Sequence, residues 1–112
     1  MKEITDNLVK FDREMSWNHY ENLKTKEERM QRLYIEIVNC LGELGELANL
    51  VKKCNRDNKW CVEELQEEVA DTFVFLLKIA KTVDMDLKEE VLKKIKKNKE
   101  RFKYLRKEEG KK

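Results

Sequence analysis

The chain has 112 residues, and 43% of them are charged although the formal net charge is only +2. This length suits one domain with a modest core, and helical proteins of this size often associate to bury more surface. Interspersed charges of both signs indicate a solvated surface, so we expect no specific nucleic-acid partner. No run of eighteen apolar residues is present and no apolar segment follows Met1, which predicts a cytoplasmic protein without a membrane partner.

The first predicted helix carries Ile4, Leu8, Phe11 and Met15 at helical spacing. It is followed by a polar and aromatic connector, SWNHYENLKT. The chain contains no proline and no alternating pattern of apolar and polar residues, so β-structure is not expected. The predicted fold class is therefore all-α.

The second predicted helix begins at a capping box formed by Thr25 and Glu28 and continues to about Cys54. If this helix bends, the bend is expected at Gly42. After the break NRDNK, the third helix covers about 61–83. Asp86 and Glu89 form another capping box, which opens a fourth helix that extends to about 106. We expect one helical domain over 1–107 and a flexible basic tail over 108–112.

Three cysteines, Cys40, Cys54 and Cys61, are odd in number and lack the CxxC spacing of metal and redox motifs. In a cytoplasmic protein such cysteines are reduced thiols that serve as small apolar residues. We therefore predict neither a disulfide nor a zinc site.

Two acids of the second helix, Glu43 and Glu46 in GELGEL, lie at the margin of its main apolar face. Gly42 and Gly45 on the far side predict the close approach of another helix. The core face itself comprises Leu33, Ile37, Cys40, Leu41, Leu44, Leu47, Ala48 and Val51.

The third helix repeats this arrangement, because Glu68 falls between Ile79 and Phe75, with Asp71 one turn further on. An unpaired buried carboxylate is costly unless it is neutralised. If the two helices face one another, four carboxylates converge, and Mg²⁺ prefers such oxygen ligands. The alternative is a set of solvated surface acids, because an acid-rich chain produces pairs at this spacing by chance, as at Glu3/Asp6, Glu64/Glu67 and Asp86/Glu89.

The segments CLGELGELANLVKK and EELQEEVADTFVFLLKIAKTVDMDLKEEVLKKIKKNKERF resemble the MazG-like all-α nucleotide pyrophosphohydrolases. The signature of that family is ExxE, a spacer, ExxD, and then a lysine and an asparagine on the last helix, and the resemblance covers roughly residues 36–104. It implies a four-to-five-helix bundle that assembles into a homodimer or homotetramer. It also implies hydrolysis of nucleoside triphosphates to the monophosphate and pyrophosphate with Mg²⁺, for which Mn²⁺ can substitute. By this resemblance the catalytic residues and metal ligands are Glu43, Glu46, Glu68 and Asp71.

Substrate-binding residues are expected mainly on the last helix. Residues 93–112 hold eleven Lys or Arg and three Asp or Glu, whereas residues 1–92 hold fourteen and twenty. Lys94 and Asn98 match the family's KxxxN element and imply phosphate contacts, as does Arg101. By the same resemblance Phe75 would lie against the sugar and Trp17 against the base. The alternatives are a solvated basic face for the cations and core packing for the two aromatic residues.

Two other kinds of function are compatible with a helical bundle. A non-catalytic helical bundle that mediates assembly predicts that the four acids are solvated and that their removal is harmless. A carboxylate-bridged di-iron protein needs Glu-x-x-His on its helices, and His19, the only histidine, cannot supply it.

Overall fold

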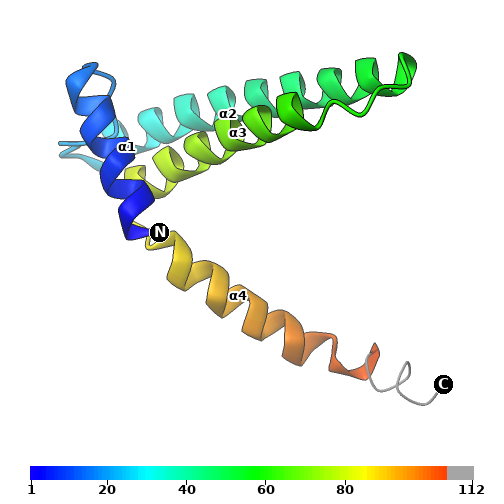
Figure 1. Cartoon of the computed structure of the whole chain (residues 1–112). Helices are drawn as coiled ribbons and strands as arrows, with labels where there is room; N and C mark the ends of the chain where they lie inside the picture. The colour runs from blue at the N-terminus through cyan, green and yellow to red at the C-terminus, as the bar shows by residue number, and fades with distance from the viewer. Residues whose placement is uncertain (106–112) are drawn as a thin grey trace.

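The computed structural model describes residues 1–105, and within this range the secondary structure is helical throughout, without strands, as the sequence predicted (Figure 1). No described helix is long and apolar enough to cross a membrane. The predicted tail, 108–112, and the predicted domain boundary at 107 lie outside the described residues. The helices are α1 (Lys2–Glu14), α2 (Lys26–Arg56), α3 (Val62–Thr82) and α4 (Leu87–Arg101).

Both predicted capping boxes open their helices. At the start of α2 the hydroxyl of Thr25 accepts a hydrogen bond from the backbone N–H of Glu28 at 3.0 Å, and the Glu28 carboxylate accepts one from the N–H of Lys24 at 3.0 Å. At the start of α4 the carboxylate of Asp86 accepts from the N–H of Glu89 at 3.1 Å. These side chains satisfy backbone donors that the first turn of a helix leaves free.

Helices α2 and α3 form an antiparallel hairpin (Figure 1). α2 continues as one helix through Gly42 and Gly45, and apart from the adjoining residues and backbone of α2 itself no described atom lies within 4 Å of the position that a Cβ would occupy at either glycine. The expected approach of another helix at these glycines is therefore not made within one chain.

The turn between α2 and α3 contradicts one prediction. Cys54 and Cys61 form a disulfide that joins the end of α2 to the residue before α3, so the expectation of three reduced thiols was wrong for this pair. The reversal of the chain at Asn58, where φ is 53°, brings together two cysteines whose spacing matches no familiar motif. Cys40 is free.

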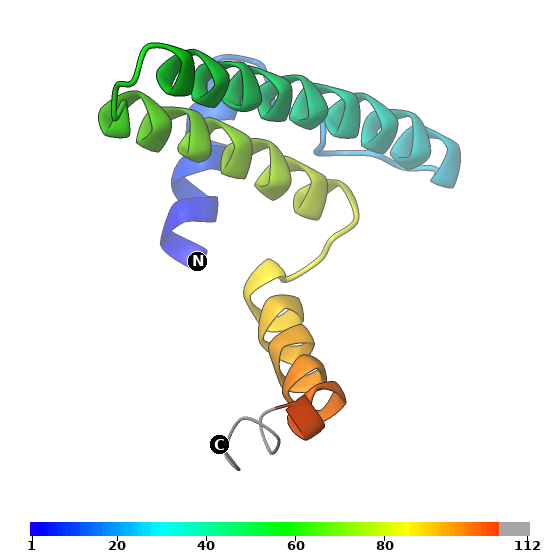
Figure 2. The ribbon, with the colours of Figure 1, turned by 90° about the vertical axis from the view of Figure 1, so that its right-hand side faces the viewer.

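α1 crosses the opposite end of the hairpin, and α4 runs away from the hairpin in two views at right angles (Figures 1 and 2). α4 ends at Arg101, where the N–H of Phe102 bonds to the carbonyl of Asn98, and after this one turn residue, residues 103–105 are helical again. The predicted end near 106 lies outside the described residues. No described helix packs along α4.

The core of a single copy is small. Leu77 and Ala80 of α3 are buried beneath α1, together with Val9. In contrast, Leu41, which the sequence placed on the core face of α2, is 66% exposed. Five of the eight residues of the predicted α2 core face are exposed, namely Ile37, Leu41, Leu44, Ala48 and Val51.

Candidate metal centre

Two contacts along the hairpin show the register of α2 against α3. The thiol of Cys40 lies 4.0 Å from the carbonyl oxygen of Thr72, and the guanidinium of Arg29 donates to the carbonyl of Thr82 at 3.2 Å. One turn beyond Cys40, towards the disulfide, this register places Glu43 opposite Glu68. The two predicted acidic positions therefore meet between the helices.

Three of the four predicted ligands come together at this level. Glu43, Glu68 and Asp71 each offer a carboxylate oxygen, and these atoms lie within 4.8 Å of one another. Glu43 and Glu68 are half-buried, and Asp71 is exposed. We call these three residues the acid triad. Glu46 is exposed and lies outside the triad, although its charge acts on both glutamates.

The acid triad is electrostatically unfavourable by itself. Burial raises the pKa of Glu43, and the neighbouring charges of Glu46, Asp71 and Glu68 raise it further. Burial also raises the pKa of Glu68, with additional repulsion from Glu46, Asp71 and Glu67. One carboxylate oxygen of Glu68 is buried without a hydrogen-bond partner in the described structure. A cation would relieve both the repulsion and this unsatisfied oxygen.

The ligand set fits a small hard cation. All three side chains offer oxygen, which Mg²⁺, Mn²⁺ and Ca²⁺ accept in preference to softer ligands. Oxygens around one Mg²⁺ lie about 2.1 Å from the ion, and hence at most about 4.2 Å apart. The acid triad is close to this spacing, so small side-chain rotations are enough to close it around an ion.

A buried ion pair that the sequence did not identify lies on the same side of α2. Glu36 is only 3% exposed, and one of its oxygens accepts two hydrogen bonds from Arg32, at 2.9 and 2.6 Å. The other carboxylate oxygen has no partner in the described structure. Glu36 precedes Glu43 by two turns of the helix, so it faces the same groove. The pair could have been predicted from the sequence, because Arg32 stands four residues before Glu36 on the same helix and residues at this spacing are neighbours.

A second unpredicted network anchors α1 and the connector to α3. The hydroxyl of Tyr20 donates to the carboxylate of Asp12 at 2.7 Å, and the ammonium of Lys78 lies 3.8 Å from the same carboxylate oxygen. Asp12 is 1% exposed, and burial followed by the hydrogen bond to Asp12 raises the pKa of Tyr20. Lys78 also lies 5.0 Å from the centre of the Phe75 ring, one turn beyond Asp71. The network therefore ties α1 to α3, and its Lys78 contacts an aromatic ring one turn beyond Asp71.

The predicted substrate residues are not brought together in one copy. Phe75 lies near the triad on α3, whereas Trp17 packs edge-to-face on Phe11, with ring centres 5.8 Å apart. The other three, Lys94, Asn98 and Arg101, lie on α4, which runs away from the hairpin. Their substrate-binding role stays a prediction.

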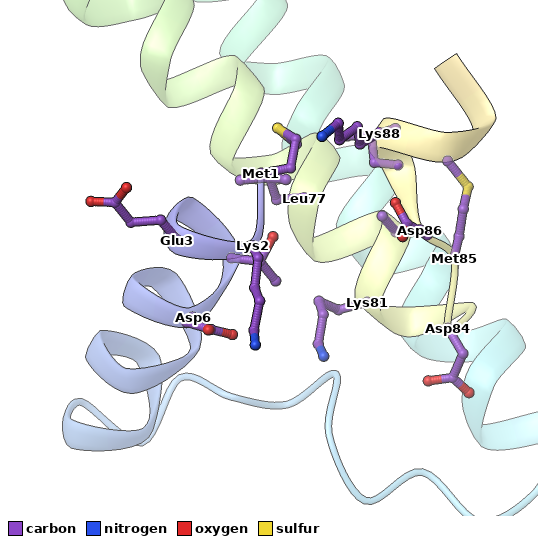
Figure 3. Close-up of a pocket in the computed structure, with 13 residues that line it drawn as sticks. Met1, Lys2, Glu3, Asp6, Leu77, Lys81, Asp84, Met85, Asp86 and Lys88 are labelled. Carbon is purple, nitrogen blue, oxygen red and sulfur yellow. The ribbon is translucent and has the colours of Figure 1, made fainter. Parts of the chain in front are cut away.

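A large cavity lies elsewhere, between the start of α1, the end of α3 and the start of α4 (Figure 3). It has a volume of about 650 Å³ and is lined by charges of both signs, including Lys2, Lys81, Asp6 and Asp84. In the close-up the acidic side chains point in different directions and do not meet (Figure 3). Converging carboxylates are the stronger sign of a functional site, so we assign the candidate centre to the acid triad.

Compared with protein-family models, curated proteins and solved structures, the chain matches none of them.

Proposed function

We propose that the protein is a divalent-cation-dependent hydrolase that cleaves nucleoside triphosphates between the α and β phosphates, giving the monophosphate and pyrophosphate. The observation that carries this proposal is the acid triad: three carboxylates that converge across two helices, with raised pKa values for Glu43 and Glu68. The reaction itself is inferred from the resemblance of the surrounding segments to the MazG-like enzymes.

The proposal divides the four acidic residues between metal binding and proton transfer. Glu43, Glu68 and Asp71 hold Mg²⁺, which when bound neutralises crowded phosphate oxygens and assists departure of pyrophosphate. Glu46 lies next to the triad without belonging to it, and in this proposal its carboxylate takes a proton from the attacking water. The water oxygen then forms a bond to phosphorus, and the bond to the bridging oxygen breaks.

The remaining contacts come from two regions. Phe75 borders the triad and would contact the sugar, and Trp17 would contact the base. Lys94, Asn98 and Arg101 would bind phosphate when α4 lies beside an acid triad. We also propose a homo-oligomer, either a dimer or a tetramer, because a single copy leaves much of its apolar surface exposed.

The proposal includes a cytoplasmic location. Stable disulfides are rare in that compartment. A cytoplasmic location therefore requires the bond between Cys54 and Cys61 to resist cellular reductants or to form reversibly.

A non-catalytic assembly protein is the alternative, and the exposed apolar surface of α2 favours it. This alternative gives no reason for the half-buried carboxylates of Glu43 and Glu68 to face one another. It predicts that replacing any acid of the triad leaves all measurable properties except stability unchanged.

The test is a panel of ribonucleoside and deoxyribonucleoside triphosphates incubated with Mg²⁺, in which pyrophosphate release is measured. Glu68→Gln should reduce release at least about a hundredfold, as expected when charge stabilisation of the transition state is lost. Glu63→Gln is the matched control, because Glu63 is an exposed acid of α3 outside the triad. Release of orthophosphate would contradict the bond assignment, and absence of any release would contradict the hydrolase proposal.

A further inference from the structure

The disulfide between Cys54 and Cys61 closes the end of the hairpin that lies far from α1 (Figure 1). The two hydrogen bonds that show the register of the hairpin both lie on the α1 side of the acid triad. On the turn side of the triad, the described residues of α2 and α3 form no hydrogen bond or ion pair with each other. The disulfide is therefore the one specific link between the helices on this side.

Packing on the turn side is also weak. Of residues 44–70, which include the turn, only Cys54 is buried. Leu47, Leu50 and Leu65 in this segment are half-buried, whereas the α1 side of the hairpin buries Leu77 completely. Apolar contacts within one copy therefore hold the turn side less firmly than the α1 side, and the disulfide contributes correspondingly more.

Like charges oppose the pairing of the two helices at the turn side. Residues 62–71, at the start of α3, contain five acids and no Lys or Arg, and residues 43–51 of α2 contain two acids and no Lys or Arg. Burial and then the charges of Glu46 and Asp71 raise the pKa of both Glu43 and Glu68, so each helix repels the acids of the other. Without a cation, the triad is held together against this repulsion.

The disulfide is close enough to the acid triad to control its geometry. Glu68 stands seven residues after Cys61, about 10 Å along the helix, and Glu43 stands eleven residues before Cys54, about 16 Å. Oxygens around one Mg²⁺ lie at most about 4.2 Å apart, and those of the triad lie within 4.8 Å of one another. An outward movement of the first turns of α3 would therefore take Glu68 out of binding distance.

A cavity beside the disulfide gives a reductant access to it. The cavity has a volume of about 610 Å³, and Cys54 lines it together with Trp60 and other residues of the turn. Lys52 and Lys59 also line it, and their charges attract an anionic thiolate. Cys61 is half-buried, so neither partner of the disulfide is sealed from solvent by a surrounding core.

We propose that Cys54 and Cys61 form a redox switch for the acid triad: the oxidised hairpin binds a divalent cation, and reduction by a dithiol weakens this binding. A thiolate of the dithiol attacks one sulfur of the pair, and the other sulfur leaves as a thiolate and takes up a proton. The second thiol of the dithiol then breaks the mixed disulfide and releases the first cysteine as a thiol. The protein gains two electrons and two protons, and the dithiol becomes a cyclic disulfide.

This inference rests on the cation site of the proposed function and is independent of the hydrolysis reaction. The test compares Mg²⁺ binding by the oxidised chain and by the chain in excess dithiothreitol. Dissociation constants are obtained from the thermal midpoint over a Mg²⁺ series at fixed protein concentration and ionic strength. The constant should be at least about tenfold larger for the reduced chain, a coupling of the size usual between two sites.

Coupling between two sites is reciprocal, so Mg²⁺ should make the disulfide harder to reduce. Equilibration with thiol–disulfide mixtures of known potential measures this effect. Saturating Mg²⁺ should lower the reduction potential by about 30 mV, which is a tenfold change for a two-electron couple. If the reduced chain is largely unfolded, the potential still decides, because a cation that binds only the oxidised form lowers it further. A potential that does not change with Mg²⁺ would overturn the proposal.

Variants assign the response to its residues. The double variant Cys54→Ser/Cys61→Ser should bind Mg²⁺ as weakly as the reduced chain and should not respond to dithiothreitol. Cys40→Ser is the matched control, because Cys40 is free, and it should keep both the tenfold difference and the change in potential. Glu68→Gln should lose the change in potential, and Glu63→Gln should keep it.

The outcomes separate the switch from the proposed function. Equal dissociation constants for the oxidised and reduced chains would overturn the switch and leave the cation site standing. No response to Mg²⁺ in either form would overturn both. A double variant that binds Mg²⁺ as tightly as the oxidised chain, or a Cys40→Ser variant that loses the redox response, would also overturn the switch. Redox-dependent Mg²⁺ binding without pyrophosphate release would support the switch and contradict only the hydrolase proposal.

Discussion

Glu43 of α2 and Glu68 of α3 meet across the hairpin with Asp71, and each glutamate has a raised pKa. The causes are burial first and then the repulsion of neighbouring carboxylates. In the metal-free protein these groups oppose folding at neutral pH, because the folded state holds their protons more tightly than the unfolded chain. The acid triad is thus a source of instability that a cation can remove.

The first prediction concerns pH. A carboxyl group with a raised folded-state pKa adds stability below its unfolded value of 4.5, and this stability is lost as the pH rises through the folded pKa. Metal-free protein in chelator should therefore lose a few degrees of thermal midpoint above about pH 4.5. Glu68→Gln should flatten this loss, and Glu63→Gln should not. Equal slopes for the two variants in thermal scans would contradict the assigned cause.

The second prediction concerns divalent cations. A ligand that binds only the folded state stabilises it by mass action, by about 2.7 kcal/mol at a hundred times its dissociation constant. Saturating Mg²⁺ at neutral pH should raise the thermal midpoint by at least about 5 °C. Glu43→Gln should abolish most of this rise.

Glu63→Gln serves as the control for the cation experiment as well. A rise of the same size in Glu43→Gln and in the wild-type chain would show that the cation acts elsewhere. Monovalent salt at matched ionic strength separates specific binding from general screening of the acidic side.

The third prediction concerns the disulfide between Cys54 and Cys61. Closing this short loop restricts the unfolded chain, so Cys61→Ser should lower the free energy of unfolding by about 2 kcal/mol. Urea unfolding at fixed protein concentration measures the change. Cys40→Ser is the control and should change stability less, because Cys40 is in no disulfide. Identical urea midpoints before and after treatment of the wild-type protein with reductant would contradict a stabilising role.

The fourth prediction concerns the buried contact between Tyr20 and Asp12. Tyr20→Phe removes the donor to a carboxylate that is 1% exposed, and Lys78 at 3.8 Å then remains as its nearest cation. The loss should be about 1.5 to 3 kcal/mol, the range for hydrogen bonds to charged groups. Tyr104→Phe, on an exposed tyrosine, should be neutral in the same urea experiment. Equal midpoints for the two variants would show that the hydrogen bond contributes nothing.

The features that the sequence predicted well are local. The capping boxes at Thr25 and Asp86 depend on residues three positions apart, and the meeting of Glu43 with Glu68 follows from helical spacing once the hairpin forms. The disulfide was missed because its cysteines approach only when the chain reverses at Asn58.

Contacts that depend on the path of a connector or on the packing of a helix could not be predicted from the sequence, for a different reason. The contact of Tyr20 with Asp12 depends on a connector that turns through left-handed conformations at Ser16 and Asn22, and residue spacing does not encode that path. The direction of α4 depends on what packs against it, and no described helix does so. Apolar spacing alone predicts that the exposed side of α2 is core, because the spacing is the same whether the partner surface is in the same chain or in another.

Helices α2 and α3 are separated by only five residues of turn, and their contacts dominate the tertiary structure. A hairpin of this kind closes a small loop and gains most of its contacts between nearby parts of the chain, so its contact order is low. Helical domains of low contact order fold within microseconds to milliseconds. The hairpin should therefore form early during folding, whereas α1 must wait for the connector to dock before the barrier to the native state is crossed.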